Sequence, residues 1–279
     1  MPKFEHQGRL IAYDVHGEGE RTLVLIHGLL MNRHMFDRLA PAMAARGNRV
    51  VSVDLLGHGE SDRPPETVNY GMPFFSQEVV GLLDHLGVEE AVIGGTSLGA
   101  NTALTIARDA PQRVRGMMVE MPVLDNALLG VSVIFTPILL GLRFGEPLLK
   151  RTAALTRRIP RSNYILDLWL DLARQDPTAS AAVLEGLFLG AGAPHHDERV
   201  KMRQPALVIG HRADPLHPLS DSGMLAEELP NARLIEANSI LEWRISPERL
   251  DAELSSFLDE TWAGAAVPEP AEPRLRELR

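Results

Sequence analysis

The feature of this chain that most constrains its fold is a repeated order of short apolar runs and amphipathic segments. Apolar runs that end in glycine or proline lie at residues 21–28, 90–99 and 114–122. Short continuous runs of this kind are typical of strands that are buried on both faces of a sheet. Helical patterns follow some of them, as at residues 74–87 and 101–110. Strands that alternate with helices predict a mostly parallel sheet with helices on both faces.

The same reasoning extends along most of the chain. Further strands are expected at residues 9–15, 49–59, 204–214 and 232–238, and a further helix at residues 221–230. One long segment breaks the alternation. Residues 125–202 contain several helical stretches and no convincing strand, so we expect an inserted helical cap there. The core of about eight strands then comprises residues 1–124 and 203–262, and residues 263–279, rich in Pro, Ala and charge, predict a disordered tail.

Composition and charge exclude some classes of partner and predict a location. The formal net charge of −9 argues against a nucleic-acid partner, which would need a basic face to meet phosphates. The chain has no cysteine and no apolar signal core in its first ten residues, so we expect a cytoplasmic protein without disulfides. The most apolar run, residues 127–142, is too short for a membrane span and contains Pro137. It predicts a buried or groove-lining helix pair.

The motif with the clearest chemical meaning is GTSLG at residues 95–99, which matches G-x-S-x-G. A buried strand precedes it and a helix follows, which is the context of a nucleophile elbow. The tight turn crowds the backbone, so glycines are needed on both sides of Ser97. The N-terminus of the following helix points free N–H groups toward the site, where they favour developing negative charge.

Two other segments extend this pattern: HGLL at residues 27–30 and DLLGHGESDRP at residues 54–64, each after a buried strand. Together with GTSLG they resemble the α/β-hydrolase family, in the branch with a helical cap, over roughly residues 8–262. The resemblance implies an eight-stranded α/β-hydrolase fold with Ser97 as nucleophile. It also implies an oxyanion hole made by the N–H groups of Leu29 and Leu98. His27 and His58 match family positions that are usually structural.

The resemblance places an acid just past the strand that follows the cap. GHRADPLHP, residues 210–218, supplies Asp214 there. A carboxylate at that point would hold an imidazole in the correct tautomer and stabilise it once charged. A second family location for the acid follows the strand at residues 114–122, where Glu120 and Asp125 are weaker candidates.

The catalytic base is missing from the position that the resemblance implies. The family order is Ser, acid, His, and the histidine follows the last strand. That segment reads ANSILEWRISPERL at residues 237–250 and contains no histidine, and the last histidine of the chain is His217. His217 is the leading substitute, although its three-residue spacing from Asp214 is short. His34, His195, His196 and a desolvated Glu242 are the other candidate bases.

Four interpretations remain open at this stage. Another residue can replace the missing histidine, or the reaction can need no deprotonation of Ser97, as in a lyase, cyclase or isomerase. The protein can also bind a ligand without turning it over, or the histidine can have been removed from this chain. The leading hypothesis is a serine hydrolase with an atypical or incomplete triad.

The predicted cap indicates the class of substrate. Residues 131–144, 164–170 and 183–190 are apolar on more than one face, as helices that line a pocket would be. A small or medium apolar ester, lactone or related carbonyl compound is therefore expected. The arginines of residues 151–161 are expected to be solvated. The pair His195 and His196 lacks partners at ligand spacing, and no phosphate loop is present, so neither a metal nor a cofactor is expected.

Overall fold

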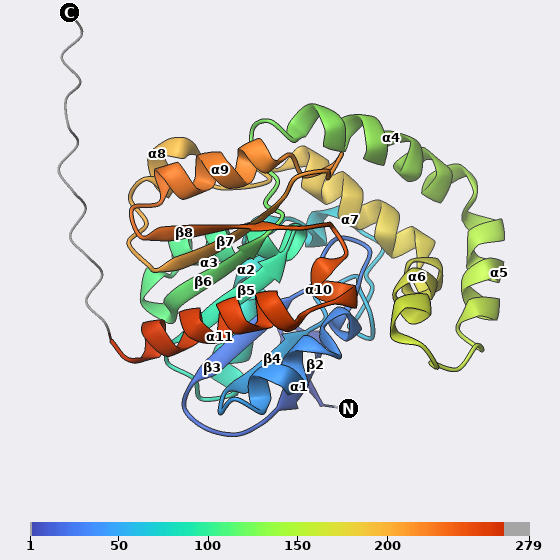
Figure 1. Ribbon diagram of the computed structural model, residues 1–279. Coiled ribbons are helices and arrows are strands. Elements are labelled where there is room, and N and C mark those ends of the chain that lie inside the picture. The colour runs from blue at the N-terminus through green and yellow to red at the C-terminus, as the bar shows by residue number, and fades with distance from the viewer. Residues whose placement is uncertain (1, 265–279) are drawn as a thin grey trace, which may run out of the picture.

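A computed structural model of the chain describes residues 2–264, and its centre is one eight-stranded sheet. The strands are β1 (Lys3–His6), β2 (Arg9–His16), β3 (Thr22–Ile26), β4 (Arg49–Val53), β5 (Ala91–Thr96), β6 (Val114–Glu120), β7 (Ala206–His211) and β8 (Ala232–Ala237). Their order in the sheet is β1-β2-β4-β3-β5-β6-β7-β8 (Figure 1). The β1–β2 and β2–β4 pairs are antiparallel, and all other pairs are parallel. The predicted α/β-hydrolase fold class is confirmed.

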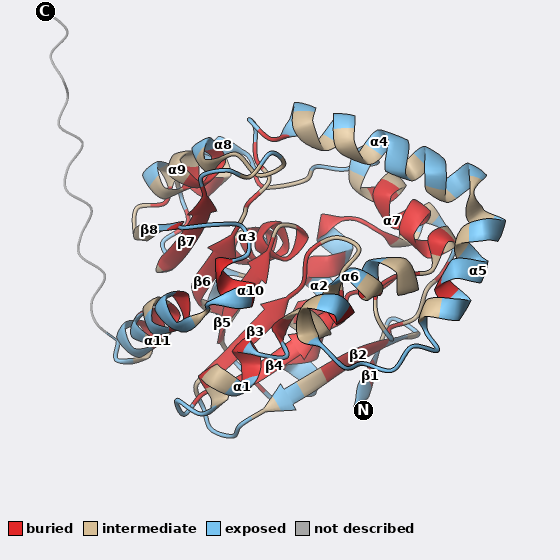
Figure 2. Ribbon diagram, turned by 45° about the vertical axis from the view of Figure 1, so that its right-hand side comes forward, coloured by how far each residue is buried: buried red, intermediate tan, exposed pale blue. Residues whose placement is uncertain are grey.

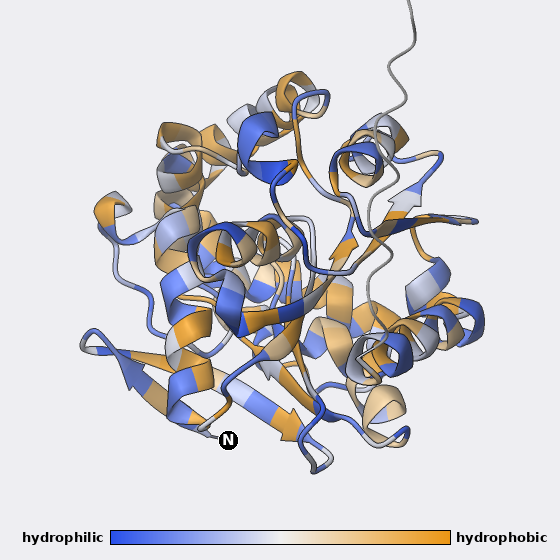
Figure 3. Cartoon of the chain, turned by 90° about the vertical axis from the view of Figure 1, so that its left-hand side faces the viewer, coloured by the Kyte–Doolittle hydropathy of each residue, from blue (hydrophilic) through white to orange (hydrophobic). Residues whose placement is uncertain are grey.

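The central strands form because their side chains are apolar on both faces. Every residue of β3, β5 and β7 is buried, which matches the continuous apolar runs of the sequence. In Figure 3 the helices around the sheet mix hydrophobic and hydrophilic segments along their length. The edge strand β1 was not predicted. It has four residues, of which only Phe4 is buried, so its hydrophobic pattern is too short to read.

Helices cover both faces of the sheet. The core helices are α1 (Leu39–Ala44), α2 (Met72–His85), α3 (Leu98–Asp109), α9 (Leu219–Glu228), α10 (Glu242–Ile245) and α11 (Glu248–Trp262), with short 3₁₀ helices η1 (Arg33–Phe36), η2 (Thr67–Asn69) and η3 (Pro111–Arg113). One apolar cluster packs α2, α3 and α9 on one face, and a second packs α1, α10 and α11 on the other. The carboxyl ends of the parallel strands therefore open at one edge, where ligands bind in folds of this kind.

Five helices lie between β6 and β7. They are α4 (Leu128–Phe144), α5 (Glu146–Thr156), α6 (Tyr164–Arg174), α7 (Pro177–Leu189) and α8 (His196–Arg199), and the described chain has no strand in this interval. Figure 1 shows α4, α5 and α6 arching around one side of the core. We propose residues 125–202 as the cap and residues 1–124 and 203–262 as the core. Most of the predicted tail, residues 265–279, lies outside the described residues.

The apolar run at residues 127–142 does not form the predicted helix pair. It belongs to the single helix α4, which continues through Pro137. No residue of α4 is buried, and Leu129 and Phe144 are 77% and 84% exposed. Figure 2 shows the exposed outer surfaces of α4 and α5 in pale blue. No single described helix is long and apolar enough to span a bilayer, whereas α4 and α5 pass that test only as a pair bent by 91°.

Candidate active site

Ser97 lies in the turn between β5 and α3, with a backbone φ of 55° that residues other than glycine rarely adopt. The neighbouring glycines make this turn possible. A Cβ atom on Gly95 would lie 2.3 Å from the carbonyl carbon of Gly99, and one on Gly99 would lie 2.0 Å from the carbonyl oxygen of Ile26. The G-x-S-x-G spacing is therefore a steric requirement of the turn that presents Ser97 at the edge of the sheet.

The Ser97 hydroxyl meets a histidine. His217 Nε2 lies 2.9 Å from Ser97 Oγ, and His217 Nδ1 lies 2.8 Å from Asp214 Oδ2. The His217 side chain is only 10% exposed, so the arrangement is shielded from water. The loop between β7 and α9 thus supplies both an acid and an imidazole to a serine about 120 residues earlier in the chain.

The short spacing between Asp214 and His217 is accommodated by a tight turn. Asp214 Oδ1 accepts hydrogen bonds from the backbone N–H groups of Leu216 and His217, at 2.8 and 3.0 Å, which leaves Oδ2 for the imidazole. Burial acts to raise the pKa of Asp214. The hydrogen bonds and charge of His217, with the two backbone donors, outweigh burial and hold this pKa below its ordinary value. The carboxylate therefore stays charged beside the ring.

Both residues that the resemblance assigns to an oxyanion hole lie at the cavity that contains Ser97. Leu29 and Leu98 line one cavity together with Ser97 and His217. Within residues 2–264, neither the Leu29 N–H nor the Leu98 N–H has a hydrogen-bond acceptor, so both are free to donate to a ligand. Leu98 is also the first residue of α3, where the helix dipole favours negative charge.

Arg244 occupies the segment in which the family histidine was expected. Its guanidinium is buried, and Nη2 donates to Glu120 Oε2 at 2.8 Å and to Thr96 Oγ1 at 3.3 Å. Burial acts to raise the pKa of Glu120, but Arg244 and His211 outweigh it and lower this pKa to about 2. Glu120 is therefore engaged by a cation and, among the described residues, forms no hydrogen bond with His217. No sequence motif marks an arginine in that loop, so the position of Arg244 is apparent only in the folded structure.

The remaining candidate residues lie elsewhere. His34 pairs with Asp37, and His196 with Glu228. His195 caps α8. Glu242 binds Arg249 and the backbone of Asn238, and Asp125 pairs with Arg199 at the surface. None of these side chains is hydrogen-bonded to Ser97 in the described chain.

His27 and His58 are buried against each other, with ring centroids 4.7 Å apart. Burial lowers the pKa of His27 to about 4 and that of His58 to about 3, so both are neutral at pH 7. His27 Nε2 accepts a hydrogen bond from the Leu55 N–H and thereby ties the two loops together. These contacts are structural ones.

The cavity above Ser97 is apolar and about 320 Å³ in volume. Its wall includes Met72 of the core, Val131 and Phe135 of α4, and Leu184 and Leu187 of α7. No charged Asp, Glu, Lys or Arg side chain of the described residues lines it. The cavity can therefore desolvate a small apolar ligand next to the serine. Among residues 2–264, no group of three or more His, Asp or Glu side chains could hold a metal ion.

Comparison with known proteins agrees with the observed fold. Residues 21–136 match the family model described as the alpha/beta hydrolase fold. A stretch of 118 residues, 41% of this chain, is 39% identical to the dihydrolipoyllysine-residue acetyltransferase component of the acetoin cleaving system of Pseudomonas putida and covers 30% of it. A stretch of 106 residues, 37% of this chain, is 38% identical to the sn-1-specific diacylglycerol lipase ABHD11 of Mus musculus and covers 34% of it. The matches thus span about a third of these curated relatives.

Solved structures extend the likeness to most of the chain. The enol-lactonase from Burkholderia xenovorans LB400 superposes with a TM-score of 0.77 over 93% of this chain and 100% of that one, at 22% identity. Identity at this level establishes a shared fold and leaves the reaction to be argued from the site.

Proposed function

The chain has the α/β-hydrolase fold, and from this premise we propose that it is a serine hydrolase of a small or medium apolar ester, lactone or related carbonyl substrate. The observation that carries the proposal is the 2.9 Å contact between Ser97 Oγ and His217 Nε2. A serine hydroxyl is a poor nucleophile unless a base accepts its proton, and an imidazole at hydrogen-bond distance is such a base.

Acylation follows from the positions of the side chains. His217 Nε2 takes the proton of Ser97 Oγ as the oxygen bonds to the substrate carbonyl carbon. The carbonyl oxygen becomes an oxyanion and accepts hydrogen bonds from the Leu29 and Leu98 N–H groups. Asp214 Oδ2 accepts the Nδ1–H of His217 and stabilises the imidazolium. The oxyanion then collapses, the bond to the leaving oxygen breaks, and His217 gives its proton to that oxygen.

Deacylation repeats these steps with water. His217 removes a proton from a water molecule, whose oxygen attacks the acyl carbon of the Ser97 ester. The second oxyanion occupies the same pair of N–H groups. When it collapses, the Ser97 oxygen leaves and regains its proton from His217, and the carboxylic acid product departs. For a lactone, the leaving hydroxyl and the acid belong to one product molecule.

The cavity supports the choice of substrate. Its volume of about 320 Å³ is at the small end for ligand sites, and its wall offers no charge to pair with a charged acyl chain. Asn101 contributes a polar side chain to the cavity wall, where a substrate group could be recognised. Its amide is already engaged by the backbone carbonyls of Val123 and Gly192, each at 2.8 Å. Apolar contact therefore dominates recognition.

The alternative is a non-hydrolytic enzyme, or a binding protein without turnover, on the same fold. Both alternatives predict that removal of Ser97 or His217 leaves ester turnover unchanged at a background level. The contact between these two residues favours hydrolysis over the alternatives, because a binding role gives no reason for an imidazole–carboxylate pair aimed at a serine hydroxyl.

The test is hydrolysis of p-nitrophenyl butyrate by the purified wild type, Ser97→Ala, His217→Ala and His34→Ala. We expect Ser97→Ala and His217→Ala each to lower kcat at least about 1,000-fold. His34→Ala is the matched control, because that histidine pairs with Asp37 and should keep full activity. A fluorophosphonate should also label wild type at Ser97, with a mass increase that the Ser97→Ala variant lacks.

Two outcomes would overturn the proposal. Equal, background-level rates for wild type and Ser97→Ala across esters and lactones of short and medium chain would point to the alternatives. If His217→Ala is fully active while Ser97→Ala is inactive, Ser97 is still the nucleophile but another residue is the base.

A further inference from the structure

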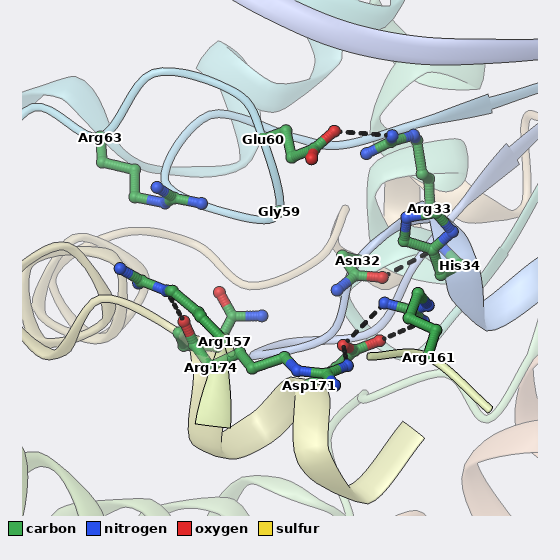
Figure 4. A pocket seen from close by; sticks show the side chains of 11 residues that line it. Asn32, Arg33, His34, Gly59, Glu60, Arg63, Arg157, Arg161, Asp171 and Arg174 are labelled. Atoms are coloured by element: carbon green, nitrogen blue, oxygen red, sulfur yellow. Dashed lines mark hydrogen bonds and ion pairs between the residues drawn. The ribbon is translucent and has the colours of Figure 1, made fainter. Parts of the chain in front are cut away.

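A second pocket, about 240 Å³ in volume, lies between the loops of the core and the helices of the cap. Its charged lining residues are Arg33, Arg63, Arg157, Arg161, Arg174, Glu60 and Asp171 (Figure 4). The pocket shares no lining residue with the cavity above Ser97. It thus differs from the proposed catalytic site in both composition and location.

Three of these arginines have acidic partners. Arg33 pairs with Asp14, Asp54 and Glu60. Arg161 and Arg174 share Asp171, at 2.8 and 2.9 Å, and Arg174 also pairs with Asp167 at 3.4 Å. The charge of these three side chains is therefore balanced within the structure.

Arg63 and Arg157 differ from the others. In the described part of the chain, neither has an acidic side chain within ion-pair distance. Arg63 Nε is buried without a hydrogen-bond acceptor, and Arg157 donates only to the backbone carbonyl of Arg174. Figure 4 shows Arg63 pointing from its loop toward the side of the pocket that Arg157 and Arg174 form. Burial and the nearby Arg157 charge lower the pKa of Arg63.

The acidic side chains that act electrostatically on Arg63 already have other hydrogen-bond or ion-pair partners. Asp54 and Glu60 bind Arg33, and Asp176 accepts the backbone N–H groups of Thr178 and Ala179 at the start of α7. A half-buried guanidinium without a counter-ion loses hydration that nothing replaces. The guanidinium groups of Arg63 and Arg157 also repel each other, because two positive charges line the same pocket.

We propose that this pocket binds a small oxyanion, a phosphate or a carboxylate, held between Arg63 of the core and Arg157 of the cap. Guanidinium groups match the paired oxygens of both anions with bidentate hydrogen bonds. A bound anion supplies the counter-charge that the chain lacks at this point. It also links the core to the cap close to where Gln175 Nε2 donates to the Met31 carbonyl, and it therefore stabilises the docked cap.

The experiment is calorimetric titration of the full chain with inorganic phosphate and, separately, with succinate, at constant ionic strength set with chloride. We expect one oxyanion to bind to one site and to raise Tm beyond the chloride control. Arg63→Gln and Arg157→Gln should each weaken that binding about 10-fold or more. Arg151→Gln is the matched control, because Arg151 is an exposed cation of α5 that does not line the pocket.

The free protein gives a second readout that separates a binding role from a structural one. Without oxyanion, Arg63→Gln should melt at the wild-type temperature or above it, because the change removes a repelled cation. A lower Tm for that variant would indicate a structural ion pair and overturn the proposal. If wild type binds neither anion, or if Arg63→Gln binds it equally well, the proposal is also overturned. The anion that wild type binds more tightly identifies the ligand class.

An independent observation concerns the outer face of the cap. Leu129, Val133, Phe144 and Leu148, on α4 and α5, are large apolar side chains that are each more than 60% exposed. Exposed apolar surface of this extent on neighbouring helices indicates an interaction site. Residues 128–162 carry six cationic side chains in a chain whose net charge is −9. Arg143, Lys150 and Arg161 pair with Glu185, Glu146 and Asp171. Arg151 and Arg158 have no acidic partner among the described residues and leave this segment cationic.

We infer that this face docks on an anionic lipid bilayer. A second copy of the chain would bring the same cations against each other, whereas an anionic surface complements them. Apolar side chains beside Lys and Arg are the composition of helices that lie in a membrane interface. The opposite side of α4 lines the Ser97 cavity through Val131 and Phe135, so the docked face adjoins that cavity.

The test is co-sedimentation with phosphatidylcholine vesicles, with and without phosphatidylserine. We expect at least about 10-fold stronger partitioning onto the anionic vesicles, and a loss of that gain at high salt. Leu129→Ser with Phe144→Ser should abolish binding, while Val68→Ser, a control that is 78% exposed on η2, should retain it. No vesicle binding, or a dimer that these two substitutions dissociate, would overturn the inference.

Discussion

Arg244 and Glu120 form a buried ion pair beside the Ser97 turn, with Arg244 Nη2 2.8 Å from Glu120 Oε2. Glu120 ends β6 at the second position where the family places its acid. Its carbonyl also accepts the Ser97 N–H at 2.8 Å. The loop that lacks a histidine therefore neutralises Glu120 with a guanidinium, and the imidazole next to Ser97 comes from a different loop.

The first prediction concerns this pair. Arg244→Met leaves Glu120 buried without its main counter-charge, so the free energy of unfolding should fall by about 3–5 kcal/mol. Urea denaturation measures this change. Combining Arg244→Met with Glu120→Gln removes both charges and should recover much of the loss. If Arg244→Met alone is as stable as wild type, the pair contributes nothing to the fold.

A second prediction follows from Glu78 of α2, which is buried with a single hydrogen bond from the Leu56 N–H. Burial raises the pKa of Glu78 to about 8. Because the folded-state pKa exceeds the unfolded value of about 4.5, the folded state binds more protons. The stabilisation that comes from protonated Glu78 is complete below pH 4.5 and is lost as the pH rises toward 8.

Replacement by Gln should flatten this pH dependence. Between pH 5 and 8, wild type should lose stability by a few kcal/mol relative to Glu78→Gln. Parallel denaturant titrations across that range provide the measurement. Parallel stability curves for the two proteins would show that Glu78 titrates normally.

A third prediction tests the glycines of the serine turn. Gly99→Ala puts a Cβ atom 2.0 Å from the Ile26 carbonyl oxygen, so strand β3 and helix α3 must move apart. We expect a loss of at least about 3 kcal/mol in unfolding free energy, or failure to fold. The control is Gly141→Ala in α4, where no atom lies within 4 Å of the new Cβ. That change should stabilise the helix by about 1 kcal/mol. Equal melting temperatures for the two variants would contradict the steric argument.

A fourth prediction concerns Asp214. Asp214→Asn keeps the shape of the side chain but removes the charge that orients and stabilises the His217 imidazolium. The proposed mechanism predicts a decrease in kcat of about 10,000-fold with little change in KM. Steady-state ester hydrolysis measures both constants. Asp125→Asn changes another candidate acid and should keep the wild-type kcat. If Asp125→Asn loses activity and Asp214→Asn does not, Asp125 is the acid.

Local sequence patterns were sufficient for the fold and for the turn that holds Ser97. The apolar runs of β3, β5 and β7 predict buried strands because side-chain burial on both faces leaves only apolar residues. The glycines at 95 and 99 predict the turn because steric crowding acts between residues close in sequence. These constraints are local, so a single sequence contains them.

The arrangement around Ser97 was decided by tertiary structure. His217 and Ser97 are 120 residues apart, and Arg244 and Glu120 are 124 apart, so no periodicity or spacing relates either pair. The sequence left five candidate bases, and only the docking of the β7–α9 loop against the β5–α3 turn brings His217 to the serine hydroxyl. The exposure of α4 could not be predicted from the sequence either, because an apolar run does not reveal whether the fold supplies a partner to cover it.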